Sequence, residues 1–124
     1  MPVKTKVPKG DILSIDIGGT NIKSCVLNAR SKLLTEYKKS PTPKNSTPSE
    51  VLKVIKKLCV DFKKFERISI GFPGYVKMGV VQTAPNLAEN KWANVDLAQQ
   101  IANIFNKPVR LINDADQQGL GIVS

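Results

Sequence analysis

Short apolar runs, separated by glycine, proline and polar residues, mark the first part of the chain. Isoleucine, valine and leucine dominate residues 11–17 and 22–28, and a weaker apolar run covers 32–39. Apolar runs of this length, bounded by turn residues, predict strands. The polar residues 28–31 predict a hairpin turn between the second and third strands. Residues 1–10 are polar and lysine-rich, and they predict a flexible basic leader.

Apolar residues at helical spacing follow in the middle of the chain. The sequence Thr47-Pro48-Ser49-Glu50 has the form of a capping box with proline at the first helical position. It predicts a helix that runs to about Phe62, with a lysine-rich face that is typical of a solvated surface. The apolar face comprises Val51, Val54, Ile55, Leu58 and Phe62.

The second half of the chain repeats this alternation of strand and helix. A second helix is predicted with Asn94 as its N-cap and an end before Pro108. Short apolar segments at 67–71 and 109–112 predict buried strands, and residues 115–124 predict the start of a third helix. A small hairpin is expected at residues 75–81, and the apolar face of the second helix comprises Leu97, Ile101, Ile104 and Phe105.

This order of elements predicts an α/β fold with a mixed sheet and flanking helices. Helices connect the first, fourth and fifth of the main predicted strands, so these three can run parallel. Ligands bind beyond the carboxyl ends of such strands. Three unusual loops follow those ends, and they are therefore expected to meet at one edge: the turn after Asp16, the segment 71–74, and Asn113-Asp114.

The turn after the first strand carries a set of groups suited to phosphate. Gly18 and Gly19 allow positive φ, and their backbone N–H groups can form an anion-binding nest. Asp16 is placed to hold a metal ion that neutralises phosphate charge, and Thr20 and Lys23 add a hydroxyl and an ammonium. The turn is neither a P-loop nor a dinucleotide fingerprint, because no helix follows it. Taken alone, it is equally typical of a plain hairpin with a Gly-Gly turn.

The other two loops have both functional and structural interpretations. The Pro73-Gly74 turn would let a ligand approach the main chain, although proline and glycine are also ordinary turn residues. Asn113 and Asp114 can hydrogen-bond sugar hydroxyls, and Asp114 can accept a proton from an attacking hydroxyl. Asp114 could equally cap the third helix, whereas Asp116 is interpreted as a first-turn helix acid. Core packing explains Trp92 better than a sugar contact does.

Composition narrows the function classes. The chain has 124 residues, 41% of them hydrophobic, and no apolar stretch of membrane-spanning length. Without a signal-peptide core it is expected to be cytoplasmic, to contact no membrane, and to form one domain over 11–124. Cys25 and Cys59 are expected to be reduced core residues, and the lack of histidine excludes Ser/His or Cys/His catalysis within this chain. The net charge of +9 attracts polyanions, but nucleic acid is an improbable partner because few aromatic residues accompany the basic ones.

At this point the motifs resemble the ROK sugar kinases, a family with the ribonuclease H-like, actin-like ATPase fold. The resemblance runs from about Ile12 to Leu120. Residues 16–23 resemble the family's first phosphate motif, and 71–74 resemble its glycine-proline-glycine segment on the sugar side. Ala84-Pro85-Asn86-Leu87 and Asn113-Asp114-Ala115 resemble its sugar loop and its general-base motif. The stretch 72–87, followed by Trp92, is most similar to the polyphosphate glucokinase branch.

The resemblance implies phosphoryl transfer from polyphosphate or ATP to a hexose hydroxyl, with glucose 6-phosphate as the expected product. It implies that Asp114 is the general base and that Asp16 helps to hold Mg²⁺. The implied phosphate-binding residues are Gly18, Gly19, Thr20 and Lys23, and the implied sugar-binding residues are Pro73, Gly74, Asn86, Asn113 and Asp114.

Family members also have a second domain, which this sequence does not contain. The resemblance therefore implies the N-terminal half of a two-domain kinase, which on its own is expected to have little or no activity. It leaves open whether the full-length protein is a homodimer. The alternatives are a non-catalytic sugar- or polyanion-binding regulatory module of the same fold, or half of an actin-like or chaperone-type ATPase, which the sugar-side motifs disfavour.

Overall fold

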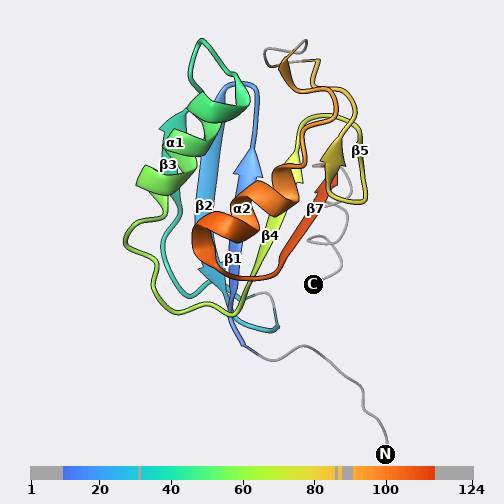
Figure 1. Cartoon of the computed structure of the whole chain (residues 1–124). Helices are drawn as coiled ribbons and strands as arrows, with labels where there is room; N and C mark the ends of the chain where they lie inside the picture. The colour runs from blue at the N-terminus through green and yellow to red at the C-terminus, as the bar shows by residue number, and fades with distance from the viewer. Residues whose placement is uncertain (1–9, 31, 86, 88–90, 114–124) are drawn as a thin grey trace, which may run out of the picture.

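The computed structural model describes residues 10–30, 32–85, 87 and 91–113 (Figure 1). A five-stranded sheet has the order β3-β2-β1-β4-β7, and a separate two-stranded sheet pairs β5 with β6. The main strands are β1 (Ile12–Ile17), β2 (Asn21–Leu27), β3 (Lys38–Pro41), β4 (Arg67–Phe72) and β7 (Val109–Asn113). The remaining elements are α1 (Pro48–Leu58), α2 (Leu97–Phe105), β5 (Val76–Lys77) and β6 (Val80–Val81).

The sheet is mixed, as the order of elements predicts. β1 pairs antiparallel with β2 and parallel with β4, and β4 pairs parallel with β7. The carboxyl ends of β1, β4 and β7 therefore lie at one edge of the sheet. Asp16 stands beside Gly71 in the register of β1 and β4, and Phe72 stands beside Asn113 in the register of β4 and β7.

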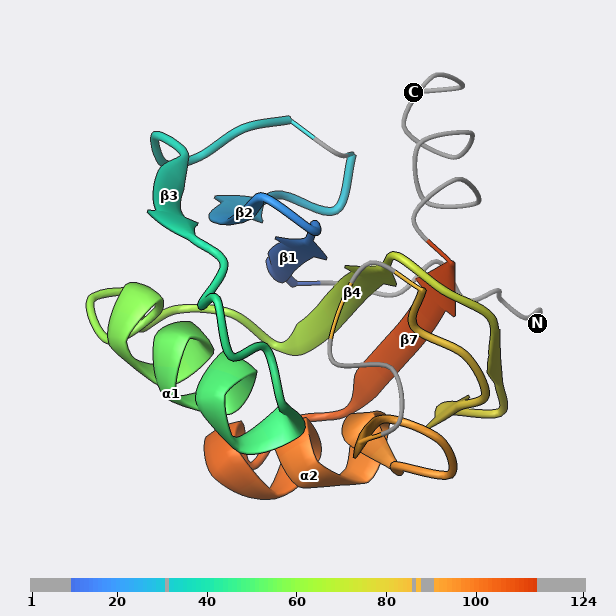
Figure 2. The same ribbon diagram turned by 90° about the horizontal axis from the view of Figure 1, so that it is seen from above.

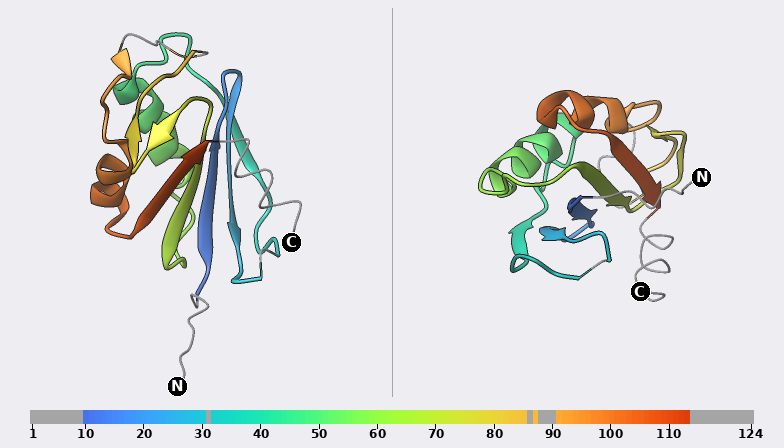
Figure 3. Two further views of the ribbon diagram at one scale, coloured as in Figure 1. Left: turned by 90° about the vertical axis from the view of Figure 1, so that its right-hand side faces the viewer. Right: turned by 90° about the horizontal axis from the view of Figure 1, so that it is seen from below.

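The core lies between one face of the sheet and the two helices. Figure 2 shows α1 and α2 side by side on the same face, and Figure 3 shows this arrangement from two further sides. Alternate residues of each central strand point into this layer, where Leu13, Ile15 and Ile17 of β1 are fully buried. The helices contribute the buried residues Val51 and Ile55 of α1 and Leu97 and Ile101 of α2. None of the helices among the described residues has the length and apolar character needed to cross a membrane.

The third strand differs from its prediction. It was expected at 32–39, but β3 covers Lys38–Pro41, and Leu33 forms only an isolated bridge to Leu27. The Val26 N–H donates to the Thr35 hydroxyl at 3.0 Å, where a continuous ladder would supply a backbone carbonyl. The side chain thus replaces the backbone as acceptor, and pairing with β2 resumes only at Lys38.

Both helices exist, but their ends differ from the prediction. Thr47 is the N-cap of α1, yet its side chain makes no capping hydrogen bond, and the helix ends at Leu58 rather than at Phe62. The N-cap of α2 is Asp96, whose Oδ1 accepts from the Gln99 N–H at 3.1 Å. Asn94 instead has a φ of 66°, which is outside the helical region.

The two cysteines behave as core residues. Cys25 and Cys59 are free thiols and both are buried, which confirms the expectation. Burial raises the pKa of Cys59 to about 11, against the smaller opposing effects of the nearby Ser24 hydroxyl and of Lys38. Burial likewise raises the pKa of Cys25, which a hydrogen bond with Tyr37 partly offsets. Neither thiol is therefore activated as a nucleophile near neutral pH.

Trp92 joins two distant segments of the core. Its side chain is fully buried, and its ring centroid lies 5.0 Å from that of Phe72. Its Nε1–H donates to the Ser46 carbonyl oxygen at 2.7 Å. The residue is thus a core residue, as expected, and it also holds the loop before α1.

Replacing Trp92 with phenylalanine removes this hydrogen bond and leaves unfilled volume in the core. We expect W92F to lower the free energy of unfolding by about 2 kcal/mol, measured by urea denaturation. Tyr75→Phe, at an aromatic residue that is 59% exposed, is the matched control and should change it by less than about 0.5 kcal/mol. Equal midpoints for W92F and the wild type would contradict the anchoring role.

Candidate functional site

Two of the three predicted loops are connected directly at the carboxyl edge of the sheet. The Asn113 side chain, at the end of β7, donates from Nδ2 to the Gly74 carbonyl oxygen at 2.7 Å. This hydrogen bond spans from β7 to the loop after β4, so Gly74 and Asn113 lie together as the sequence predicts. The glycine turn follows the neighbouring strand β1 at the same edge (Figure 1).

The glycine turn is a tight connection between β1 and β2. The Gly18 N–H donates to the Asn21 carbonyl at 2.9 Å, and a Cβ on Gly18 would lie 2.8 Å from that same oxygen. Glycine is therefore needed at position 18 for close approach. Positive φ is not the reason, because among the described glycines only Gly10 and Gly79 have a positive φ. Gly19 and Thr20 are exposed, so their backbone is accessible to a ligand.

Asp16 lies on the face of the sheet that α1 and α2 leave uncovered. It alternates with Ile15 and Ile17, whose side chains are buried in the helical layer. Its neighbours in the sheet are Lys23 on β2 and Gly71 on β4. Gly71 contributes no side chain beside Asp16, which is half-buried. The strand end therefore carries an acid and an ammonium side by side in the register.

The described residues contain no cluster of three or more metal-ligating side chains. Asp16 remains a chemically suitable ligand, because Mg²⁺ is commonly bound through one or two carboxylates together with substrate phosphates and water. A metal ion bound by Asp16 would therefore need further oxygen ligands beyond the described side chains.

The loop after β4 is held by the segment that follows β6. The Tyr75 N–H donates to the Thr83 hydroxyl at 3.1 Å, and the Gln82 N–H donates to the Tyr75 carbonyl at 2.8 Å. A Cβ on Gly74 would overlap the Thr83 carbonyl oxygen. Glycine is required here by this close backbone contact, which in turn fixes the carbonyl that Asn113 contacts.

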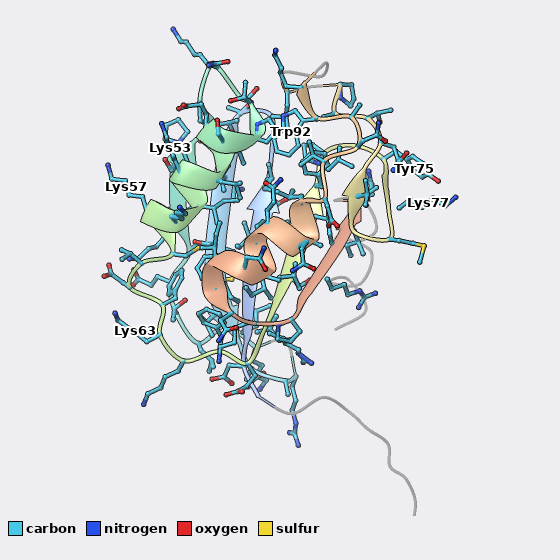
Figure 4. All side chains as sticks on the ribbon, viewed as in Figure 1. Lys53, Lys57, Lys63, Tyr75, Lys77 and Trp92 are labelled. Carbon is cyan, nitrogen blue, oxygen red and sulfur yellow. The ribbon has the colours of Figure 1, made fainter. Side chains whose placement is uncertain are left out.

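The small hairpin extends away from this contact. β5 and β6 are joined by Met78 and Gly79, with φ values of 53° and 83°, as a tight two-residue hairpin turn demands. Figure 4 shows Tyr75 and Lys77 on the outer side of the molecule, far from the lysines of α1. The predicted hairpin at residues 75–81 is confirmed.

Three of the labelled lysines lie on the side of the molecule opposite the hairpin (Figure 4). Lys53 and Lys57 project outward from α1, with Lys63 further along the chain (Figure 4). Lys53 is 71% exposed and lies 3.2 Å from Glu50. Lys38 lies 2.7 Å from Asp61 and, by hydrogen bonding and charge, lowers the pKa of that carboxyl. These contacts are those of a solvated surface.

Several predicted site residues lie outside the described residues. These are Asn86, Asp114 and the third helix expected at 115–124, so their placement stays a prediction. Of the residues next to position 86, Leu87 donates its backbone N–H to the Ala84 carbonyl at 3.1 Å. Residues 1–9 of the expected leader also lie outside the described part of the chain.

One residue of this edge was not foreseen. The Thr42 hydroxyl donates to the Gly18 carbonyl at 2.6 Å, and the Thr42 N–H donates to the Thr20 carbonyl at 2.8 Å. The sequence indicated only a loop here, from the prolines at 41 and 43. A threonine between two prolines, directly after a strand, was the available signal.

Comparisons with known proteins agree with the fold described above. The ROK family model matches residues 12–122. A polyphosphate glucokinase from Mycobacterium leprae is 33% identical over 108 residues, which are 86% of this chain and 33% of that protein. The crystal structure of an inorganic polyphosphate/ATP-glucomannokinase from Arthrobacter sp. strain KM has a TM-score of 0.81 and 32% identity, covering 90% of this chain and 47% of that one.

A ROK family glucokinase from Streptomyces griseus, solved in complex with glucose and AMPPNP, has a TM-score of 0.75 and 28% identity. The match covers 86% of this chain and 34% of that one. The present chain therefore spans less than half the length of each of these relatives. The mixed sheet and its helices have the ribonuclease H-like, actin-like fold that the sequence predicts.

If the close contact between Gly74 and the Thr83 carbonyl holds the loop after β4, a methyl group at position 74 must displace this loop. We expect G74A to lower the free energy of unfolding by about 1–3 kcal/mol, measured by urea denaturation, because the obstacle is a backbone carbonyl that cannot rotate away. Met78→Ala is the control, since Met78 is 93% exposed in the same hairpin. A G74A variant as stable as the wild type would rule out this constraint.

Proposed function

The chain belongs to the ROK family, and we propose that it forms the phosphate- and sugar-facing half of a two-domain kinase. The reaction is phosphoryl transfer to a hexose hydroxyl, with glucose as acceptor and glucose 6-phosphate as product. One observation carries the proposal: the glycine turn, Asp16 and the Gly74–Asn113 contact occupy one edge of a parallel strand arrangement. Because the chain spans only 33% of its Mycobacterium leprae relative, the activity is proposed for the full-length protein.

The glycine turn is the proposed donor site. The Gly19 N–H would face the transferred phosphoryl, whereas the Gly18 N–H closes the turn on the Asn21 carbonyl and Gly18 contributes through its close packing there. Thr20 and Lys23 would add a hydroxyl and a positive charge. Mg²⁺ held by Asp16 would neutralise charge on the phosphate oxygens. The donor is polyphosphate or ATP, which the relatives with these names and ligands support.

The loops after β4, β6 and β7 form the proposed sugar site. Pro73, Gly74, Asn86 and Asn113 would orient the hexose. Asp114, the next residue after Asn113, would accept the proton of the attacking hydroxyl. Positioning and electrostatic stabilisation provide most of the catalysis in phosphoryl transfer, so a small set of groups is sufficient.

The test of the general base is the substitution Asp114→Asn in the full-length protein. We expect kcat to fall by about 10²–10⁴-fold, because general-base catalysis contributes that much, while glucose affinity stays close to that of the wild type. Glucose 6-phosphate formation is measured with ATP and with polyphosphate as separate donors. Asp116→Asn is the matched control, and its kcat should equal that of the wild type. Wild-type kcat in D114N would remove Asp114 from the reaction.

The same assay separates the kinase from the non-catalytic module. Glucose binding without product from either donor would favour the regulatory module. The 124-residue chain alone is expected to turn over little, because a closed cleft needs a second wall that excludes water. Substantial turnover by this chain alone would contradict the two-domain proposal.

A further inference from the structure

Thr42, the residue that follows β3, makes two hydrogen bonds to the glycine turn. The Thr42 hydroxyl donates to the Gly18 carbonyl at 2.6 Å, and the Thr42 N–H donates to the Thr20 carbonyl at 2.8 Å. Both contacts come from the side of the turn that faces β3, since β3 pairs with β2 next to the turn. Two of the turn's carbonyl oxygens are therefore directed toward Thr42.

This contact also determines where an amide points. A trans peptide is planar, so its C=O and N–H point in opposite directions. Because the Gly18 carbonyl points toward Thr42, the Gly19 N–H of the same peptide points away from Thr42. We propose that Thr42 is a positioning residue, whose hydroxyl fixes the Gly18–Gly19 peptide so that the Gly19 N–H faces a bound phosphate. This role rests on the proposed function of the turn as the donor site.

The peptide needs this restraint because glycine flanks it on both sides. Without Cβ atoms, the peptide between Gly18 and Gly19 can rotate at little steric cost. A rotated peptide would present the carbonyl oxygen, with its partial negative charge, to the phosphate in place of the N–H. The Thr42 hydroxyl opposes this rotation because it holds the oxygen in a short hydrogen bond.

The restraint is itself held in place at both ends. Pro41 and Pro43 flank Thr42, and the proline at 43 restricts Thr42 to extended backbone. Further along the same segment, the Ser46 carbonyl accepts the Trp92 Nε1–H at 2.7 Å from the core. The segment that carries Thr42 is therefore restrained by the two prolines and by the hydrogen bond between Trp92 and Ser46.

Three threonine variants of the chain test the role of the hydroxyl. Thr42→Val removes the hydroxyl but keeps the shape, and Thr42→Ser restores it. Thr35→Val is the matched control. The Thr35 hydroxyl also makes a hydrogen bond to the backbone, accepting from the Val26 N–H, but it lies away from the turn. Binding of sodium tripolyphosphate is measured by titration of the ¹³C,¹⁵N-labelled chain, with the Gly18 and Gly19 amide signals and the Gly18 carbonyl carbon followed by NMR.

We expect T42V to weaken tripolyphosphate binding about fivefold, the loss of roughly one hydrogen bond, and to broaden the Gly19 amide signal as the peptide samples two orientations. The Gly18 carbonyl ¹³C shift should also move, because its hydrogen bond is lost. T42S should restore the affinity and both signals. T35V should lower stability and leave tripolyphosphate affinity unchanged.

The outcomes separate the two claims. T42V with wild-type affinity and an unchanged Gly19 signal would overturn the positioning role while the donor site stands. If T35V weakened tripolyphosphate binding as much as T42V does, the positioning role would also be overturned, because loss of stability would then explain the effect. A wild-type chain whose Gly18 and Gly19 amides do not respond to tripolyphosphate would contradict the donor site, and with it any role of Thr42 there.

Discussion

The parallel pairing of β4 with β1 on one side and β7 on the other determines which loops meet at the edge that carries the candidate site. Parallel strands end at the same edge, so residues far apart in the sequence become neighbours there. Asp16 comes next to Gly71, and Asn113 comes next to Phe72 and within hydrogen-bond distance of the Gly74 carbonyl. Antiparallel pairing of β4 would send the Gly71–Gly74 loop to the opposite end of the sheet from the glycine turn.

The pairing is stabilised from one face. The buried residues of β1, β4 and β7 pack against α1 and α2, which lie side by side on that face (Figure 2). The other face presents Asp16, Lys23 and Gly71 at the same edge. A hydrophobic layer thus fixes the sheet, and the polar strand ends lie on the face that α1 and α2 do not cover. The division follows from strand alternation, since neighbouring residues of a strand point to opposite faces.

Much of this could be predicted from the sequence, because it depends on local patterns. Alternation and helical spacing identified the central strands and both described helices, and strand order predicted where the loops meet. The errors have specific causes. The third strand was placed too early because apolar content does not reveal that the Thr35 hydroxyl replaces a backbone acceptor. Asp96 was missed as a cap because Asn94, two residues earlier, is an equally good capping residue by type.

The reasons for the glycines also required the structure. Gly18 and Gly74 are needed because backbone oxygens of Asn21 and Thr83 occupy the space of a side chain, and no local pattern encodes such contacts. The same holds for Thr42, whose partner is 24 residues away in the sequence. The contact of Thr42, between residues far apart in the sequence, fixes the orientation of a turn that the sequence already indicated.

Phosphate and hexose are proposed to bind side by side at one edge of the sheet. The decisive measurement is a crystal structure of the full-length protein with glucose and tripolyphosphate. We expect phosphate at Gly18–Thr20 and glucose hydroxyls against Gly74 and Asn113. Glucose or tripolyphosphate bound instead at the opposite end of the sheet, near Lys63 and Lys107, with the strand ends free of both ligands, would contradict this proposal.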